Sequence, residues 1–170
     1  MKRWRRAGLT ALAASIAGVA FADARWCLGF TGLGPIRAGL TTEEAQALAY
    51  WPAVTRKAHT EPCWIMPFKG GKSDFSLMII DGKVARTEVK GESTLTTLSG
   101  AHVGMTEQAL KSLYGPKLES QPHKYDENGR VFVLKSSAGD HGLRFETSAG
   151  KVTVMHAGPF EHLNYVEGCG

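Results

Sequence analysis

The chain has 170 residues and a formal net charge of +4, from 20 lysines and arginines against 16 acidic residues. Most of this charge lies at the N-terminus, where the first six residues carry four cations and the stretch up to Ala24 carries one acid, Asp23. The remaining 146 residues are near +1, so charge gives no reason to expect binding to nucleic acid or anionic lipid. With 43% hydrophobic and 21% charged residues, the composition excludes a disordered or collagen-like chain and predicts one compact domain.

The N-terminal segment has the three parts of a secretory signal peptide. Residues 1–6 form a cationic head, residues 7–21 are uncharged and largely apolar, and residues 22–24 have the small-x-small form that signal peptidase recognises. The alternative is a membrane anchor, which needs about 20 apolar residues, and this run is shorter and only mildly hydrophobic. We therefore expect cleavage near Ala24 and a periplasmic or secreted chain with no membrane span.

Three cysteines lie in the part that would be exported: Cys27, Cys63 and Cys169. An oxidising compartment pairs cysteines where geometry permits, and three single pairings are open. We favour Cys63 with Cys169, because Cys63 lies in an expected strand and Cys169 would tie down the C-terminus. Cys27 would then be buried, free or joined to another chain, and no neighbouring group marks any of the three as a catalytic thiolate.

Two stretches of the chain repeat one pattern, a glycine turn followed by a threonine and a short helix. At a shift of 65 positions, residues 39–41 (Gly-Leu-Thr) match residues 104–106 (Gly-Met-Thr). The residues that follow predict helices over 42–50 and 107–114. Helices this short need a surface to pack against, so strands are expected nearby.

The threonine of each repeat is expected to cap its helix. The hydroxyls of Thr41 and Thr106 can accept a hydrogen bond from a backbone N–H of the first turn. Only the first helix has an acid three residues on, Glu44, and so only it can form a capping box. The apolar spacing predicts one buried stripe on each helix, made of Leu40, Ala45 and Leu48 in the first and Met105, Leu110 and Leu113 in the second.

Runs of strand-forming residues separated by turns follow each helix. A shift of 68 positions superposes two tight turns, at residues 81–82 and 149–150. We predict an α+β fold of two tandem αβββ units, residues 25–94 and 95–170, joined in one compact domain whose antiparallel sheet is covered on one face by the helices. The expected strands are residues 63–68, 75–80 and 83–89 in the first unit and residues 131–135, 142–147 and 151–156 in the second.

Alternation along two strands predicts one apolar face and one face of mixed charge. Val84, Arg86, Glu88 and Lys90 are expected opposite Ala85, Thr87 and Val89, and Arg144 with Glu146 opposite Leu143, Phe145 and Thr147. The charged face would meet solvent or a partner, and plain solubility explains it equally well. The polar stretch around His123 and Tyr125 is a further candidate for contact. The candidate partner-binding residues are thus Arg86, Glu88, Lys90, His123, Tyr125 and Arg144.

The two Gly-x-Thr helix starts resemble the β-lactamase-inhibitor-protein-like family in tandem-repeat form. The related outer-membrane assembly lipoproteins (the BamE or SmpA/OmlA type) share the single-unit motif, in which the helix ends near Leu-Gly-Pro, and residues 113–116 (Leu-Tyr-Gly-Pro) are similar with one residue inserted. Residues 122–125 and 165–169 also resemble segments of exported bacterial proteins of this type. The resemblance implies a non-enzymatic module that grips another protein with its sheet face and loops. The chain departs from the pattern in two respects: no lipid-attachment cysteine is present, and the cysteines do not supply one disulfide per repeat.

No complete catalytic or cofactor motif is found. Residues 70–73 (Gly-Gly-Lys-Ser) resemble the tail of a phosphate-binding loop, but Met66 stands where its first glycine is required. The histidines lack the spacing of a metal site. Sugar hydrolysis stays open only because three carboxylates, Glu88, Glu146 and Glu161, can meet on a folded sheet.

We therefore expect an exported, non-enzymatic module without cofactor or metal that inhibits or escorts another extracytoplasmic protein. A lectin-like carbohydrate-binding protein is the leading alternative, and a small periplasmic hydrolase is a remote one. The lectin hypothesis depends on aromatic residues that can stack on sugars, although their spacing is also typical of a protein core: Trp64, Phe68, Phe75, Phe132 and Phe145.

Overall fold

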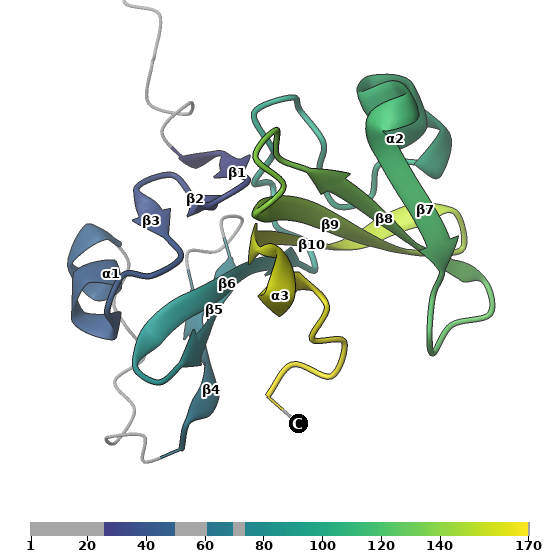
Figure 1. The fold of residues 1–170 in the computed structure, drawn as a ribbon. Coiled ribbons are helices and arrows are strands. Elements are labelled where there is room, and N and C mark those ends of the chain that lie inside the picture. Colours follow the sequence, from purple (N-terminus) through teal and green to yellow (C-terminus); the bar gives the residue numbers. More distant parts are fainter. Residues whose placement is uncertain (1–25, 50–60, 70–73, 170) are drawn as a thin grey trace, which may run out of the picture.

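The computed structural model describes residues 26–49, 61–69 and 74–169 (Figure 1). The signal peptide expected at residues 1–24 and the glycine-rich loop at residues 70–73 lie outside the described residues. The regular structure of the described chain is mainly antiparallel β-sheet with a few short helices, which fits the α+β class.

A seven-stranded antiparallel sheet forms the body of the protein. All six expected strands are confirmed, and two of them have the expected bounds. From one edge to the other the strands are β4 (Cys63–Phe68), β5 (Phe75–Ile80), β6 (Lys83–Lys90), β10 (Lys151–Pro159), β9 (His141–Ser148), β8 (Gly129–Lys135) and β7 (Leu118–Pro122).

Four strands follow the second helix, where the sequence pattern predicts three. The additional strand is β7, which pairs with β8 from Leu118 to Pro122. Its sequence, LESQP, is polar and mostly exposed, so it lacks the apolar alternation that indicates a strand. An edge strand of this kind needs no apolar face, because only one of its sides pairs and solvent covers much of the rest.

Shorter elements complete the fold. A small sheet of β1 (Leu28–Gly29), β2 (Gly32–Leu33) and β3 (Ile36–Arg37) precedes α1 (Thr42–Leu48), and α2 (Glu107–Tyr114), the 3₁₀ helix η3 (Gly115–Lys117) and α3 (Phe160–Leu163) follow. The two expected helices are confirmed, although the described part of α1 ends earlier than predicted. The small sheet and α3 lack a sequence signal because they are two to four residues long.

Both threonine caps are confirmed. The Thr41 hydroxyl accepts a hydrogen bond from the Glu44 N–H, and the Glu44 carboxylate accepts one from the Thr41 N–H, which completes the capping box. The Thr106 hydroxyl accepts from the Ala109 N–H alone. Only α1 has a capping box because the residue three positions after its cap is a glutamate, whereas in α2 it is an alanine.

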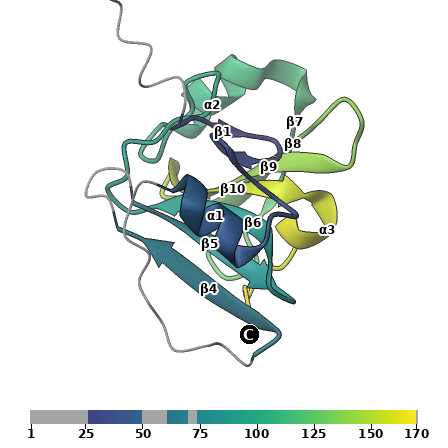
Figure 2. The same ribbon diagram turned by 90° about the vertical axis from the view of Figure 1, so that its left-hand side faces the viewer.

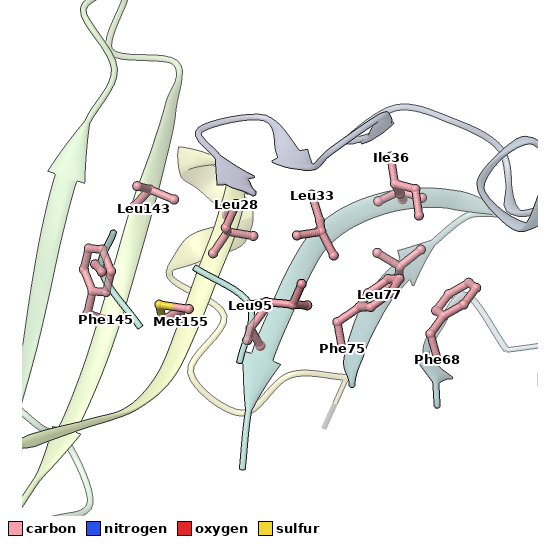
Figure 3. Packing of buried hydrophobic residues seen from close by; sticks show 14 of the residues in the cluster. Leu28, Leu33, Ile36, Phe68, Phe75, Leu77, Leu95, Leu143, Phe145 and Met155 are labelled. Atoms are coloured by element: carbon pink, nitrogen blue, oxygen red, sulfur yellow. The ribbon is translucent and has the colours of Figure 1, made fainter. Parts of the chain in front are cut away.

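The hydrophobic core lies between the sheet and a layer formed by α1, α2 and the small sheet (Figures 1 and 2). We call this side of the sheet the inner face. Figure 3 shows the leucines and isoleucine of the small sheet packed over the apolar side chains of the strands. The rings of Phe68 and Phe75 are stacked at 4.7 Å between centroids. The core includes Leu28, Leu33, Ile36, Phe68, Phe75, Leu77, Phe132, Leu143, Phe145 and Met155.

The expected helix stripes are only partly buried. Ala45 and Leu110 are fully buried, but Leu48 and Leu113 expose 38% and 40% of their surface. Each helix has only two turns, and a residue three positions on lies about 60° further round the helix. Ala45 and Leu110 are therefore the deepest residues of the two stripes, whereas Leu40 and Met105 are partly buried against the core. Tyr114, in the last turn of α2, also packs on the sheet, with its ring 5.7 Å from that of Phe145.

Equivalent backbone hydrogen bonds dock each Gly-x-Thr turn on the hairpin of its own half. Val84 exchanges bonds with the turn of residues 39–40, at 2.8 Å for each of the two N···O distances. Val152 exchanges the corresponding bonds with residues 104–105, at 2.7 and 2.9 Å. The sequence repeat thus has a physical counterpart, since each turn is fixed to its hairpin in the same way.

A β-bulge corrects the expected alternation along β6. The register shifts by one residue beside Ala85, so Val84 pairs with Ile79 whereas Arg86 pairs with Met78. Because neighbouring residues of β5 point to opposite faces, Val84 joins the core and does not share a face with Arg86. A second bulge, between Val152 and Val154, lies at the equivalent position of β10.

Candidate functional site

The charged residues singled out in the sequence lie on the other side of the sheet, which we call the outer face. Antiparallel pairing places Glu88 of β6 opposite His156 of β10, and His156 opposite Arg144 of β9. Glu146 lies one pleat further along β9 on the same face, and His123 approaches it from the segment between β7 and β8. The register of three central strands therefore gathers these side chains in one place.

These side chains form a continuous ionic network across the outer face. His156 Nε2 lies 3.2 Å from Glu88 Oε2, and His156 Nδ1 lies 3.2 Å from Arg144 Nη1. Arg144 is also paired with Glu146, whose other oxygen is 3.3 Å from His123 Nε2. The Lys90 amine closes the far end, 2.6 Å from Glu88 Oε1. We use "the ionic network" for Glu88, Lys90, His123, Arg144, Glu146 and His156.

The partners of His156 assign its proton. The guanidinium of Arg144 has only donors, so Nδ1 must accept, and the carboxylate of Glu88 accepts, so Nε2 must donate. The imidazole is therefore neutral, with its hydrogen on Nε2. Burial also lowers the His156 pKa, in agreement with a ring that stays uncharged at neutral pH.

Both carboxylates of the ionic network are held in the charged form. Burial acts to raise the pKa of Glu88, but the hydrogen bond from His156 and the hydrogen bond and charge of Lys90 outweigh it and lower the pKa to about 2. Burial likewise acts to raise the pKa of Glu146, and the charge and hydrogen bond of Arg144, with the hydrogen bond from His123, outweigh it and lower the pKa. Neither group can then act as a proton donor near neutral pH.

Arg86 lies beside the ionic network and holds the C-terminal end of the chain. Its guanidinium donates to the carbonyl oxygens of His162 and Tyr165, at 3.2 and 2.8 Å, and lies 3.9 Å from Glu88. Burial lowers the pKa of this guanidinium, though an arginine remains charged. Arg86 is thus a buried side chain that anchors the C-terminal end of the chain to the sheet.

Residues 160–169, which we call the strap, cover part of the outer face. α3 lies against β9 (Figure 1), and a Cβ added at Gly142 of that strand would lie 2.9 Å from the Leu163 side chain. At one end the strap is joined to β4 by the Cys63–Cys169 disulfide. Two residues earlier, at the same end of the strap, Glu167 accepts hydrogen bonds from Lys124 and Tyr125. The strap therefore links β4, at one edge of the sheet, with the segment that follows β7, at the opposite edge.

The expected disulfide is confirmed, and it closes a sequence separation of 106 residues. On the chain-entropy account a loop of this length stabilises the fold by about 4–5 kcal/mol at most. Cys27 is half-buried and lies outside the disulfide. Disulfides persist in oxidising compartments, so the pairing indicates an extracytoplasmic or other oxidising environment.

Two hollows lie on the outer face. One, of about 430 Å³, is lined by four members of the ionic network, by Arg86 and Ile65, and by the end of the strap; the four are Glu88, Lys90, Glu146 and His156. The other, of about 580 Å³, lies toward β4 and shares Ile65, Glu88 and Lys90 with the first. Exposed apolar side chains stand at or near these hollows, namely Ile65, Tyr125, Tyr165 and Val166.

The structure separates the six candidate contact residues by exposure. Tyr125 and Lys90 are exposed, whereas His123 and Glu88 are mostly covered. Arg86 and Arg144 are each only 3% exposed, so the expectation that they face solvent is wrong. The strap covers Arg86, and the other side chains of the ionic network enclose Arg144.

Two parts of the site have no motif in the sequence, His156 and the strap. A signal for His156 was nevertheless present, because the shift of 68 that superposes the two hairpins also places it on Glu88. When two equivalent strands pair about a local two-fold axis, equivalent residues become neighbours. The shift predicts this contact only when β6 and β10 are known to be adjacent strands.

The side chains proposed for sugar chemistry are differently placed. Four of the five aromatic residues named for sugar stacking are buried in the core, and Trp64 packs against it. Glu88 and Glu146 do converge on His156, but Glu161 is exposed and pairs with His162. Across residues 26–49, 61–69 and 74–169, no three His, Cys, Asp or Glu side chains are grouped as metal ligands.

No helix in the described part of the chain has the length and apolar character required to cross a membrane. Comparison of the chain with models of protein families, with curated protein sequences and with solved structures gave no match in any of the three.

Proposed function

We propose that this chain is an exported, non-enzymatic module that binds another extracytoplasmic protein through its outer face and inhibits or escorts it. The observation that carries the proposal is the outer face itself, on which hollows and exposed apolar side chains surround a fixed ionic network. Exposed apolar groups beside ordered charges are typical of protein contact surfaces.

The state of the carboxylates favours binding over hydrolysis. Sugar hydrolysis needs one carboxylic acid with a raised pKa, so that it can protonate the leaving oxygen. Glu88 and Glu146 have lowered pKa values, and each is bound by basic partners. Such groups are suited to fixed electrostatic contact and not to proton donation.

The edges of the sheet favour docking on the face. Both edge strands contain a proline, Pro67 in β4 and Pro122 at the end of β7. A proline has no N–H to offer an added strand, and prolines and charges at edges discourage strand addition. The partner is therefore expected on the outer face and not as an eighth strand.

The fold that we propose is two tandem αβββ units of the β-lactamase-inhibitor-protein-like type, with β7 as an addition to the second. Support comes from the equivalent docking of the two Gly-x-Thr turns and from the equivalent bulges in β6 and β10. The direct pairing of Glu88 with His156, residues related by the shift of 68, agrees with a local two-fold axis between the units.

Affinity capture from an envelope extract tests the function, using the unaltered protein and two matched variants. Ile65→Glu places a charge in the hollows, and Leu98→Glu changes an apolar residue that is 76% exposed and lines neither of them. We expect one protein to be captured by the unaltered chain and by Leu98→Glu, and lost with Ile65→Glu. Capture that is equal for both variants would overturn the proposed face. Binding to a glycan array without protein capture would favour the lectin, and hydrolysis of a glycan or ester that is lost with Glu88→Gln would favour an enzyme.

A further inference from the structure

The last residues of the strap are held in two different ways. Cys169 is joined covalently to Cys63 of β4. Glu167 is held from the opposite side, because one of its carboxylate oxygens accepts hydrogen bonds from the Lys124 amine and the Tyr125 hydroxyl. These three side chains are exposed, so each bond between them is weak. A change in the segment that carries Lys124 and Tyr125 can therefore release this side of the strap while the disulfide keeps its end in place.

His123 fixes the position of Tyr125. Its Nδ1 accepts a hydrogen bond from the Tyr125 N–H, at 3.2 Å, and its Nε2 lies 3.3 Å from a carboxylate oxygen of Glu146. A backbone N–H can only donate and a carboxylate can only accept, so Nδ1 must accept and Nε2 must donate. This arrangement therefore requires a neutral imidazole with its hydrogen on Nε2. The His123 side chain is 14% exposed, so it can exchange protons with solvent while the chain stays folded.

A second proton on the His123 ring breaks one of its two bonds. The proton has to go to Nδ1, where a donor would then face the N–H of Tyr125. The bond of Nε2 to Glu146 remains and gains a charge, so the ring stays in place and the backbone of Tyr125 has to move. His102 differs in this respect. Its Nδ1 lies 2.9 Å from the carbonyl oxygen of Val103, to which it can only donate, so protonation breaks no bond there.

His123 is the group near this end of the strap that changes its charge in mild acid. Imidazoles gain a proton between about pH 8 and pH 5. Hydrogen bonds lower the pKa of Glu167 and of Asp126, and the pKa of Glu146 is lowered as well, so these carboxylates stay ionised. Burial lowers the pKa of His156, so that ring gains its proton at lower pH than an ordinary histidine. The titratable and charged groups around His123 are Glu146 with its partners Arg144 and His156 in the sheet, Lys124 and Asp126 in its own segment, and Glu167 in the strap.

We infer that His123 is an acid-sensitive latch, whose protonation at Nδ1 moves Tyr125 away from Glu167 and frees residues 166–168 of the strap. The movement is confined to this short segment for two reasons. The buried guanidinium of Arg86 still holds the strap through its backbone carbonyl oxygens, and the disulfide still holds its end. The latch is therefore reversible and does not require the sheet to unfold.

The latch changes the shape of the outer face. Residues 166–168 form one wall of the hollow of about 430 Å³, opposite Ile65. Their release opens that wall and moves the partly exposed side chain of Val166. The release itself requires no partner, whereas its use to regulate partner binding by pH rests on the proposed function.

NMR of the purified, ¹⁵N-labelled protein between pH 8 and pH 5 tests the latch without a partner. The ring signals of His123 report its protonation, and the ¹H–¹⁵N NOE of residues 166–168 reports their mobility. We expect this NOE to fall as the pH falls, with the same midpoint as the His123 ring. Loss of one net hydrogen bond corresponds to a rise of about five-fold in the open population.

Three variants separate the latch from other effects of pH. His123→Gln keeps a neutral side chain at every pH, so residues 166–168 should be equally rigid at pH 8 and pH 5. His102→Gln is the matched control and should respond as the unaltered protein does. Tyr125→Phe removes the hydroxyl that Glu167 accepts from, so residues 166–168 should be mobile already at pH 8. Tyr125 is 59% exposed, so this variant tests the latch even if His123→Gln does not fold.

The inference is overturned if residues 166–168 of the unaltered protein are equally rigid at both pH values. It is also overturned if His123→Gln leaves the change intact, if only His162→Gln removes it, or if Tyr125→Phe is as rigid as the unaltered protein at pH 8. The proposed function fails separately. If no partner is captured from the envelope extract while residues 166–168 still become mobile in acid, the latch stands and the proposed function does not. If a partner is captured equally at both pH values, the latch does not regulate binding.

Discussion

The two faces of one sheet are stabilised in different ways. The inner face is apolar and packed against α1, α2 and the small sheet, so its contacts require no hydrogen-bond partners. The outer face buries arginines, a histidine and two glutamates under or beside the strap, and each polar atom there needs a partner to offset its lost hydration. The difference indicates that the inner face holds the fold together, whereas the outer face is kept polar at a cost in stability.

The largest effect is expected on the inner face. Phe145→Ala should reduce the free energy of unfolding by about 3–5 kcal/mol, because Phe145 is fully buried and its loss leaves a cavity. Denaturant unfolding measures the change. Leu98→Ala, at an exposed apolar position, is the control and should stay within about 0.5 kcal/mol. A loss below about 1 kcal/mol for Phe145→Ala would show that the core is not placed as described.

Removing the disulfide that holds the strap should have the next largest effect on stability. Replacing both Cys63 and Cys169 by serine removes the disulfide, and the expected loss is about 2–5 kcal/mol. Hydrogen exchange should become faster in residues 160–168, whereas the central strands of the sheet should stay protected in proportion to the remaining stability. Cys27→Ser is the control, since Cys27 lies outside the disulfide. Unchanged exchange in the strap would mean that α3 packing and the hydrogen bonds of Arg86 and Glu167 hold it without the disulfide.

The pH dependence of stability distinguishes the faces further. The Glu88 pKa is about 2 in the fold against an ordinary 4.5, so the native chain takes up this proton less readily than the unfolded one. Its contribution, about 3 kcal/mol, is therefore present above pH 4.5 and is lost as the pH falls toward 2. The lowered pKa of His156 adds a loss that begins as the pH falls below 6.5, where the unfolded chain becomes protonated first.

Unfolding by denaturant between pH 7 and pH 3 checks this dependence. Glu88→Gln should flatten the fall in stability below pH 4.5, whereas Glu119→Gln, an exposed acid of β7, should leave the curve unchanged. An equally steep curve for Glu88→Gln and the unaltered protein would remove the ionic network from the explanation.

The smallest effect is expected at the exposed end of the ionic network. Lys90→Ala removes the amine from Glu88, but the lysine side chain is largely in solvent, so the loss should stay below about 1 kcal/mol and shrink with added salt. Thermal or denaturant unfolding at low and high salt gives the comparison. A loss as large as that for Phe145→Ala would contradict the distinction between buried and exposed ionic groups.

The sequence predicts the inner face better than the outer face, for physical reasons. Apolar alternation and the threonine caps are local signals, and they identify α1, α2 and six strands. The bulge at Ala85 is not local, because it depends on how β5 and β6 pair, and it moves Val84 to the core. The burial of Arg144 and Arg86 depends on contacts distant in sequence, with His156 and with the carbonyl groups of the strap.

The disulfide was predictable because three cysteines allow few pairings and Cys169 lies at the end of the chain. The strap that the disulfide fixes was not predictable, because α3 is a single turn and the sequence around Arg86 is typical of a surface cation. The pairing of Glu88 with His156 lies between these cases, because the internal repeat contains it once the two hairpins are known to be neighbours.

Site-specific photocrosslinking in the cell tests the central claim most directly, that the outer face binds another protein. A photoreactive residue is placed at Ile65, which lines both hollows of the outer face, and in a second strain at Leu98, which is more exposed but lines neither. We expect a discrete crosslinked product from position 65 and none from position 98. A product from position 98 alone, or from neither position, would contradict the claim.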